Sequence, residues 1–359
     1  MIRTLIADDS AIVRAMLGQV IGDDKRFEIV AMAENGKAAV ELCLEHKPDL
    51  VIMDINMPVM SGLDAIKAIM EKMTTAIVVF TTEDTAEIGY ICLDAGAVEV
   101  FQKPNLATMN KEKIEDFCKK LYTISDSYSR HDLKTGSLRK SYYAQSLTKE
   151  IIRKKAEIKL QEEELKFSIL AIGASTGGPI AIQRLLKDLG PDFPLPIIIT
   201  QHIDKIFETQ FASWLKKTTG LSVLVASDGQ PLKPGYVYIA PSSRHLKIKT
   251  GTSKNLITVL DDGKEVHFLK PAVDVMFSSC ASVTAGRTLA VLLTGMGSDG
   301  AQGMKEVFDA GGCTIAQSEK SCVIYGMPKA AVALNCVRHI EDLDRIADLI
   351  KKIAGVTYE

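Results

Sequence analysis

The amino-acid sequence predicts two α/β domains, each built on a mainly parallel sheet. Two observations predict this fold class. Short apolar runs alternate with helical patterns over residues 1–104, and the same alternation starts again at Phe167 after a polar interruption. Continuous apolar runs are typical of strands that are buried on both faces, and strand–helix repeats favour parallel pairing. A length of 359 residues is sufficient for two separate hydrophobic cores.

The first domain is assigned to residues 1–122, where strands alternate with helices. The predicted strands are 5–7, 50–53 and 77–80, and the helices that follow them are 12–21, 63–70 and 88–93. A last helix, at roughly 111–121, is expected to complete the domain.

The segment 123–165 is interpreted as a partly helical linker. Ser, Thr and Tyr dominate residues 125–147, and no hydrophobic period is visible there. Residues 148–166 are charged, and we expect them to form a solvated helical spacer rather than a docking surface.

The second domain, residues 166–359, is predicted to be a doubly wound α/β fold with a mainly parallel sheet. Apolar runs at 168–172, 196–199 and 289–293 indicate buried strands. Two further segments, 236–240 and 256–260, have the composition of strands, and Asp261-Asp262-Gly263 is expected to form a turn.

The composition restricts the class of function. The formal net charge of -2 argues against a nucleic-acid-binding protein, which usually has a basic excess. No apolar run approaches the roughly 20 residues that span a bilayer, and the N-terminus lacks the apolar core of a signal peptide. We therefore expect a cytoplasmic protein without membrane insertion. The 7 cysteines show no C-x-x-C spacing and are interpreted as core residues.

Polar side chains follow several strands of the first domain. Asp8 and Asp9 come directly after one strand, Asp54 follows another, and Thr81 and Lys103 follow two more. Because the carboxyl ends of parallel strands share one edge of the sheet, we expect these side chains to lie close together. Three carboxylates would repel one another, and Mg²⁺ suits such a set. A hydroxyl and an ammonium group can hold the oxygens of a phosphoryl group.

This set of residues resembles the response-regulator receiver domain, a flavodoxin-like fold with a parallel five-stranded sheet. The resemblance covers about residues 1–122 and includes Met57-Pro58, Gly62 and Lys103-Pro104. It implies that Asp54 accepts a phosphoryl group from a histidine kinase. The sequence departs from many receivers at Val100, where an aromatic residue is common, so we do not expect an aromatic toggle.

The receiver resemblance also implies a metal site and a switch. The Mg²⁺ ligands that it implies are Asp8, Asp9, Asp54 and the carbonyl of Asn56. The switch pair that it implies is Thr81 and Lys103.

A glycine-rich turn opens the second domain. The segment 173–178, Gly-Ala-Ser-Thr-Gly-Gly, follows the predicted strand 168–172 and precedes a helix. As G-x-S-x-G it fits a nucleophile elbow, in which glycines permit a sharp turn and present Ser175 beside a helix N-terminus. The same kind of turn is also a common phosphate-binding loop. This fragment alone does not separate the two interpretations.

A base and an orienting carboxylate follow two other strands of the second domain. His202 comes after the strand 196–199, and Asp299 comes after the strand 289–293. A serine nucleophile needs both groups. Because all three residues follow predicted parallel strands, we expect Ser175, His202 and Asp299 to share one edge of the sheet.

A nucleotide-binding interpretation competes for the same place. Residues 295–300 match G-x-G-x-x-G after a strand, and Glu319 lies about 20 residues further on, as a dinucleotide site requires. However, this fingerprint usually opens its domain, and the interpretation leaves Ser175 and His202 without a role.

The order Ser, His, Asp differs from that of the α/β-hydrolases and resembles the chemotaxis protein-glutamate methylesterase (CheB-type) family. The resemblance covers about residues 166–355, and the same family joins this domain to an N-terminal receiver. The matching segments are 172–179, 201–202, 238–241, 270–274, 293–300 and 326–328. The sequence departs from many relatives after the histidine, where it has Ile203-Asp204 in place of Met-Pro.

This second resemblance implies a phosphorylation-regulated esterase. It would hydrolyse glutamate γ-methyl esters on methyl-accepting chemoreceptors to glutamate and methanol, without a cofactor for that reaction, and some relatives also deamidate receptor glutamine. Ser175 would be the nucleophile, His202 the base and Asp299 the orienting group. The backbone amides of Thr176 and Met296 are the implied oxyanion donors.

Two alternatives from other classes remain open. One is a receiver that regulates a nucleotide-binding or dehydrogenase domain, and the other is a non-catalytic signalling adaptor with a degenerate triad. A DNA-binding output is disfavoured, because the second half has no compact helix-turn-helix signal and no basic face.

Overall fold

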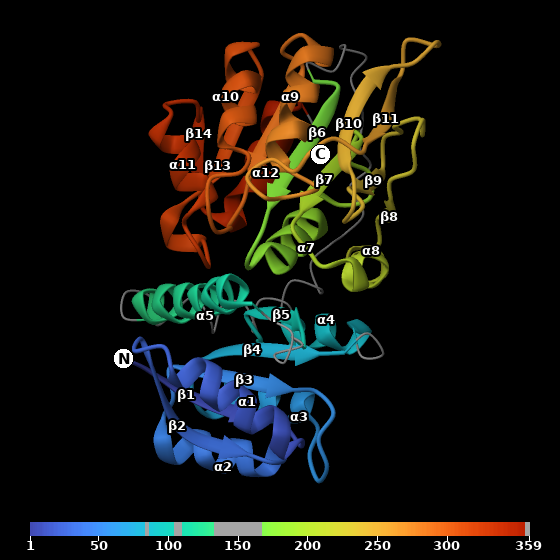
Figure 1. Cartoon of the computed structure of the whole chain (residues 1–359). Coiled ribbons are helices and arrows are strands. Elements are labelled where there is room, and N and C mark those ends of the chain that lie inside the picture. The colour runs from blue at the N-terminus through green and yellow to red at the C-terminus, as the bar shows by residue number, and fades with distance from the viewer. Residues whose placement is uncertain (83–85, 104–109, 133–166, 356–359) are drawn as a thin grey trace. The chain divides into compact units, whose positions relative to one another are not determined.

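The computed structural model describes residues 1–82, 86–103, 110–132 and 167–355. The chain divides into two compact units, Met1–Lys140 and Ser141–Glu359 (Figure 1). The charged segment at 148–166, predicted to be a helical spacer, lies outside the described residues.

The first unit is a parallel five-stranded sheet in the order β2-β1-β3-β4-β5, which confirms the predicted fold. Strands and helices alternate along the chain, and every residue of β3 and β4 is buried. The elements are β1 (Ile2–Ala7), α1 (Ala11–Gly22), β2 (Phe27–Ala33), α2 (Gly36–His46), β3 (Leu50–Asp54), α3 (Gly62–Lys72), β4 (Ala76–Thr81), α4 (Ala86–Asp94), β5 (Glu99–Gln102) and α5 (Lys111–Asp132).

Side-chain caps explain where the first three helices of this unit begin. The side chains of Ser10, Asn35 and Ser61 each accept a hydrogen bond from a backbone N–H of the first turn, at the starts of α1, α2 and α3. Such caps satisfy amide groups that have no partner within the helix.

Helix α5 continues to Asp132, so the predicted end near residue 121 is wrong. Leu121 and Ile124 are buried, which keeps the helix packed on the unit beyond the predicted end. The Oγ of Ser129 donates to the carbonyl of Ser125 one turn earlier, which lets a polar side chain remain in the helix. The part of α5 beyond residue 122 was therefore predicted as a linker, because its composition is rich in Ser and Thr.

The second unit is built on a seven-stranded sheet in the order β14-β13-β12-β6-β7-β9-β8, in which all neighbouring pairs are parallel. This confirms the predicted doubly wound fold. The strands are β6 (Ile169–Ala174), β7 (Ile197–Gln201), β8 (Ser222–Val225), β9 (Tyr236–Ile239), β12 (Thr288–Leu292), β13 (Cys313–Gln317) and β14 (His339–Glu341).

Helices cover both faces of this sheet (Figure 1). On one face α7 packs against both α8 and α12, and on the other α10 packs against both α9 and α11. The helices are α7 (Gly178–Leu189), α8 (Glu208–Thr219), α9 (Val273–Thr284), α10 (Ala301–Asp309), α11 (Met327–Ala333) and α12 (Leu343–Ile353), with short 3₁₀ turns η4 (Lys205–Phe207) and η5 (Glu319–Ser321).

A separate antiparallel hairpin, β10 (His245–Thr250) with β11 (Leu256–Asp261), lies between β9 and α9 along the chain. The sequence predicted β11 and the turn after it, where the Gly263 N–H donates to Asp261 Oδ1 at 3.0 Å. It did not predict β10, because lysines and threonine interrupt its apolar residues.

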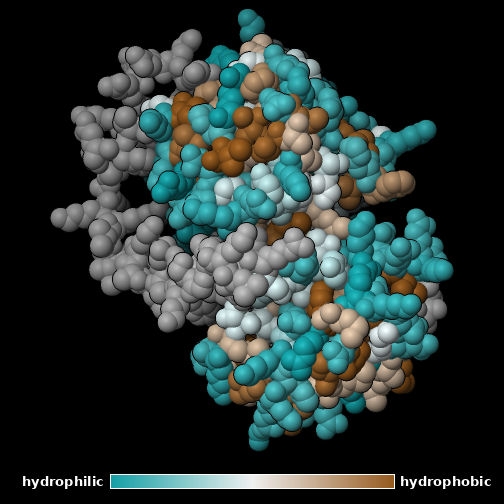
Figure 2. Space-filling view, turned by 90° about the vertical axis from the view of Figure 1, so that its left-hand side faces the viewer, coloured by the Kyte–Doolittle hydropathy of each residue, from teal (hydrophilic) through white to brown (hydrophobic). Residues whose placement is uncertain are grey.

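The surface of the second unit carries some large apolar side chains. Figure 2 shows apolar surface, with hydrophilic surface around it, in the upper part of the view. Tyr236, Phe268, Leu334 and Ile340 are the exposed large apolar residues described in this unit. All 7 cysteines are free and buried, as predicted. Within the described residues, no helix combines the length and apolar composition needed to cross a bilayer.

Candidate functional sites

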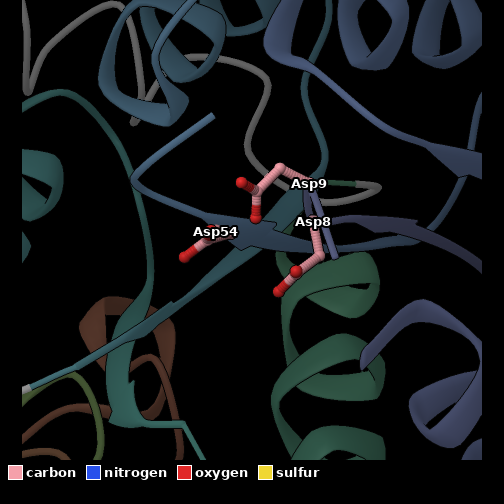
Figure 3. A group of neighbouring side chains, drawn as sticks. All are labelled: Asp8, Asp9 and Asp54. Carbon is pink, nitrogen blue, oxygen red and sulfur yellow. The ribbon is translucent and has the colours of Figure 1, made fainter. Parts of the chain in front are cut away.

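An acidic pocket lies at the carboxyl ends of β1 and β3, which are neighbours in the first sheet. Asp8 and Asp9 follow β1, and Asp54 is the last residue of β3. One carboxylate oxygen from each of the three residues lies within 4.8 Å of the others (Figure 3). Asp8 and Asp54 are buried and Asp9 is exposed. The structure therefore brings together the three acidic residues that the sequence predicted to meet.

Lys103 completes this pocket from the end of β5. Its Nζ lies 2.8 Å from Asp8 Oδ2 and 3.0 Å from Asp54 Oδ1. Burial raises the pKa of Asp54, and the hydrogen bond from Lys103 opposes that shift only in part. Burial alone would lower the pKa of Lys103, but its bonds to the two carboxylates raise it above the ordinary value. The ammonium group therefore stays charged.

Thr81 is the last residue of β4 and is fully buried. Its carbonyl accepts a hydrogen bond from the Lys103 N–H at 2.7 Å, so the two residues of the predicted switch pair are joined through the backbone. The side chains of Val100 and Thr81 both lie close to Gly89. A Cβ placed on Gly89 would lie 2.8 Å from Val100 and 3.7 Å from Thr81. An aliphatic side chain therefore occupies the place where an aromatic toggle is common.

The donor set of the acidic pocket fits a hard divalent cation. Mg²⁺ prefers one or two carboxylates together with water and phosphate oxygens, and Asp8, Asp9 and Asp54 offer such oxygens. Asn56 lies two residues beyond Asp54 and is exposed, and its carbonyl as a ligand stays a prediction. Gly62 is one of the motif residues, and the structure explains why it is a glycine. A Cβ at this position would lie 1.9 Å from the Asp54 carbonyl oxygen.

In the second unit, Ser175 lies on a sharp turn between β6 and α7. Its N–H donates to the Thr294 carbonyl at 3.0 Å, and its carbonyl accepts from the Gly178 N–H at 2.7 Å. Gly177 has a φ of 74°, in the left-handed region that favours glycine. A Cβ on Gly178 would lie 2.0 Å from Gln201 Oε1, so this turn has no room for a larger residue.

Gln201 is a buried residue that joins the serine turn to the histidine turn. Its Nε2 donates to the Ser175 carbonyl at 2.9 Å and to the His202 carbonyl at 3.0 Å. Its Oε1 is buried and has no hydrogen-bond partner among the described residues. The sequence analysis did not assign this role, and the available signal was a polar residue at the end of a buried strand, directly before His202.

His202 follows β7 and pairs with Asp299, which follows β12. The Nε2 of His202 lies 2.8 Å from Asp299 Oδ2. Asp299 also accepts hydrogen bonds from the N–H groups of Val273, at 2.7 Å, and Asp274, at 3.0 Å, at the N-terminus of α9. Burial alone would raise the pKa of Asp299, but the bonds from His202 and these amides lower it overall. The carboxylate is therefore held ionised against the imidazole.

The three residues predicted for one site thus come to one edge of the sheet, since β12, β6 and β7 are adjacent. The backbone N–H of His202 donates to the carbonyl of Ala174 at 3.2 Å, and Ala174 directly precedes Ser175 in the chain. Among the described residues, Ser175 Oγ makes no hydrogen bond to His202. Contacts between nucleophile and base are often longer before substrate binds. Because Nε2 faces Asp299, Nδ1 is the ring nitrogen that does not face this carboxylate.

Two backbone amides lie close to Ser175. Thr176 follows it directly, and its carbonyl is held by Thr294 Oγ1 at 3.0 Å. A Cβ on Gly295 would lie 2.8 Å from the Ser175 Cβ, which brings the neighbouring Met296 to the same turn. The N–H groups of Thr176 and Met296 have no partner among the described residues, as an oxyanion donor requires before substrate binds.

The buried cysteines are poor candidates for a nucleophile. The thiolate is the reactive form, and burial raises the pKa of a thiol in apolar surroundings. Burial raises the pKa of Cys280, the cysteine of α9, to about 12.

The fold and the two sites define a class of protein, a response regulator whose receiver domain is joined to an α/β domain with a hydrolase-like site. The family models agree with this class. Residues 4–115 match the response regulator receiver domain, and residues 170–350 match the CheB methylesterase domain.

The chain belongs to the CheB methylesterase family. It is 37% identical over 355 residues to protein-glutamate methylesterase/protein-glutamine glutaminase 2 of Shewanella sp. (strain MR-4), which covers 97% of this chain and 96% of the relative. The protein-glutamate methylesterase/protein-glutamine glutaminase of Archaeoglobus fulgidus is 35% identical, and the match covers 99% of this chain and 98% of the relative.

A solved structure supports the second domain. The crystal structure of the Thermotoga maritima CheB methylesterase catalytic domain is 35% identical, with a TM-score of 0.50, and covers 53% of this chain and 98% of that chain. The nucleotide-binding alternative is not favoured, because the segment 295–300 supplies Asp299 to the hydrolase-like site and the curated relatives carry esterase names.

Proposed function

We propose that this protein is a cytoplasmic, phosphorylation-regulated protein-glutamate methylesterase that hydrolyses glutamate γ-methyl esters on chemoreceptors. The observation that carries the proposal is the pairing of His202 with the buried Asp299 on the sheet edge that also holds Ser175. Relatives named for this activity match the chain over nearly its whole length.

In the proposed mechanism, Ser175 Oγ attacks the ester carbonyl carbon while His202 Nδ1 takes the serine proton. A tetrahedral intermediate forms and collapses, the bond to the methoxy group breaks, and the histidine proton goes to the departing methanol. Water then attacks the acyl-enzyme with His202 again as base, which releases glutamate and restores the serine.

Asp299 would hold the imidazole in one tautomer and stabilise its cation, since the carboxylate is ionised and fixed by two backbone amides. The amides of Thr176 and Met296 would stabilise the oxyanion, and removing one donor of this kind typically costs about 3 kcal/mol of transition-state stabilisation.

Regulation is proposed to start at Asp54, which would accept a phosphoryl group from a histidine kinase. Mg²⁺ would be held by Asp8, Asp9, Asp54 and the carbonyl of Asn56, and would neutralise charge on the phosphoryl oxygens. Lys103 and Thr81 would contact the phosphoryl group, because Lys103 already pairs with Asp54. The domain boundaries 1–122, 123–165 and 166–359 stay part of this proposal, with helix α5 continuing to Asp132 in the partly helical middle segment.

A second reaction of the same site is the deamidation of receptor glutamine. The observation that favours it is the second half of the name that the relatives carry, protein-glutamine glutaminase. The chemistry would follow the same steps, with ammonia in place of methanol as the leaving group.

The test of the proposed function is methanol release from methylated receptor membranes by the full-length protein. We expect release by the wild type and a loss of at least about 10⁴-fold in Ser175→Ala, since a triad is rarely active without its nucleophile. A serine-directed phosphonate should label the wild type and not the variant. Methanol release by Ser175→Ala at the wild-type rate would contradict the proposal.

A further inference from the structure

A two-residue turn beside the candidate active site has an unusual composition. Val266 and Leu269 exchange backbone hydrogen bonds in both directions, at 3.0 and 2.9 Å. The residues between them, His267 and Phe268, have φ values of 53° and 61°. Tight hairpin turns with two positive φ values strongly favour Asn-Gly or similar pairs, because larger side chains are strained there. This chain has an imidazole and an aromatic ring instead.

Phe268 is also the most exposed large apolar side chain among the described residues, at 94%. A single exposed apolar residue is common on protein surfaces. Here the free energy of the free protein carries two costs, the exposure of an aromatic ring to water and the strain of a positive φ. Covering such a ring with a partner recovers apolar burial, and aromatic anchors dominate the energetics of many interfaces.

The turn is held in place relative to the His202–Asp299 pair. His267 Nε2 lies 3.2 Å from Asp274 Oδ2, and the N–H of Asp274 donates to Asp299 Oδ1 at 3.0 Å. On the other side of the loop, His245 Nε2 contacts the Lys264 carbonyl at 2.9 Å. Phe268 is therefore one residue from a side chain that touches α9 at the point where α9 binds Asp299.

We infer that Phe268 is a substrate-docking residue, which packs against an apolar side chain of the receptor segment that carries the methyl ester. This inference rests on the proposed function. A receptor ester can reach Ser175 only if the polypeptide around it lies on the surface near the site, and the turn with Phe268 is joined to that site through His267, Asp274 and Asp299. Because two hydrogen bonds already fix the backbone of the turn, docking would order the side chain of Phe268 and not the loop that carries it.

The other exposed apolar residues of this unit provide a matched control. Ile340, at 49% exposed, lies on β14 at the edge of the sheet, separated from β6 by β13 and β12. An apolar contact with the receptor segment at Ser175 is not expected there. Ile340→Ala therefore removes an exposed apolar side chain away from the site.

The experiment compares Phe268→Gly, Phe268→Tyr and Ile340→Ala in the full-length protein, with methanol release from methylated receptor membranes as the readout. Glycine suits a positive φ, so Phe268→Gly should fold at least as stably as the wild type. We expect it to raise the KM for receptor about tenfold with kcat within twofold, as loss of one aromatic anchor predicts. Phe268→Tyr and Ile340→Ala should keep the wild-type KM.

A small probe separates docking from chemistry. A serine-directed phosphonate reacts at Ser175 without a polypeptide that could contact residue 268. Phe268→Gly should therefore be labelled at Ser175 as fast as the wild type. A wild-type KM in Phe268→Gly, or slow labelling by phosphonate, would overturn the inference while leaving the esterase in place. A wild type that releases no methanol would instead overturn the proposed function.

Discussion

The two candidate sites occupy the same place in two parallel sheets and solve opposite electrostatic problems. In the first unit, Asp8 and Asp54 lie side by side in the pocket, and Lys103 is the described cation that pairs with both. In the second unit, Asp299 is the single carboxylate bound to the imidazole, and two backbone amides and His202 satisfy it. The first arrangement suits a cation and a phosphoryl group, and the second suits a proton transfer.

The pKa values of two buried aspartates show the difference. Burial raises the pKa of Asp54, and the nearby Asp8 adds to this effect, although Lys103 opposes it. Burial would also raise the pKa of Asp299, but His202 and the α9 amides lower it overall. The position of an aspartate at a strand end therefore does not set its ionisation, because the hydrogen-bond donors around it decide the sign of the shift.

Among the variants that keep Ser175, the largest expected effect in the second site is that of Asp299→Asn. The amide cannot stabilise the imidazolium, so kcat for methanol release should fall about 10⁴-fold, as in other triads. Asp274→Asn is the matched control, because the Asp274 carboxylate also contacts a histidine, His267, and accepts a backbone N–H, that of Gly303 in α10. We expect it to lower kcat less than tenfold. Equal losses in the two variants would mean that Asp299 has no special role.

A smaller loss is expected for Gln201→Met, which keeps the shape of the side chain and removes its two donors. The serine and histidine turns would then shift relative to each other, and kcat should fall about 10- to 100-fold with an unchanged KM. Gln317→Met is the control, since Gln317 is equally buried but bonds to Thr294 and Ser321. Similar unfolding midpoints with a larger kcat loss for Gln201→Met would support a positioning role. An unaltered kcat in Gln201→Met would refute it.

In the first site, Asp54→Asn should remove the stimulation of methanol release by acetyl phosphate and Mg²⁺ and keep the basal rate. Couplings of this type are typically worth about 5- to 150-fold, so the expected change is smaller than that of losing the triad. Asp116→Asn, an exposed residue of α5, removes the same charge and should be stimulated normally. Equal stimulation of Asp54→Asn and Asp116→Asn would disprove the phosphoacceptor role.

The smallest expected effect concerns acid stability. The folded pKa of Asp299 is lowered, so its ionised form stabilises the fold at pH values above the ordinary value of about 3.9. That contribution is lost as the pH falls through the lower folded pKa. Asp299→Asn lacks it, so its urea midpoint should fall less steeply between about pH 5 and pH 3 than that of the wild type. A steeper fall in the variant would contradict the assigned direction.

Much of the fold was predictable because buried parallel strands carry a strong signal. The apolar runs at β3, β4, β6 and β12 marked strands that are buried on both faces, and polar residues directly after them marked one edge of each sheet. The end of α5 was missed because serine and threonine, which are neutral to unfavourable in helix interiors, here bond to the helix backbone. Local composition did not reveal that Ile124 is buried.

By itself, the sequence determined the class of fold and the family, and it predicted Ser175, His202, Asp299 and the acidic residues as site residues, since these depend on strand signals and chain order. Only the tertiary structure decided which neighbours each side chain meets. Asp299 is ionised because a helix that begins 26 residues earlier, at Val273, turns its amides toward it. Gln201 and Phe268 gained their proposed roles from contacts and backbone angles, which depend on packing between distant segments and not on local pattern.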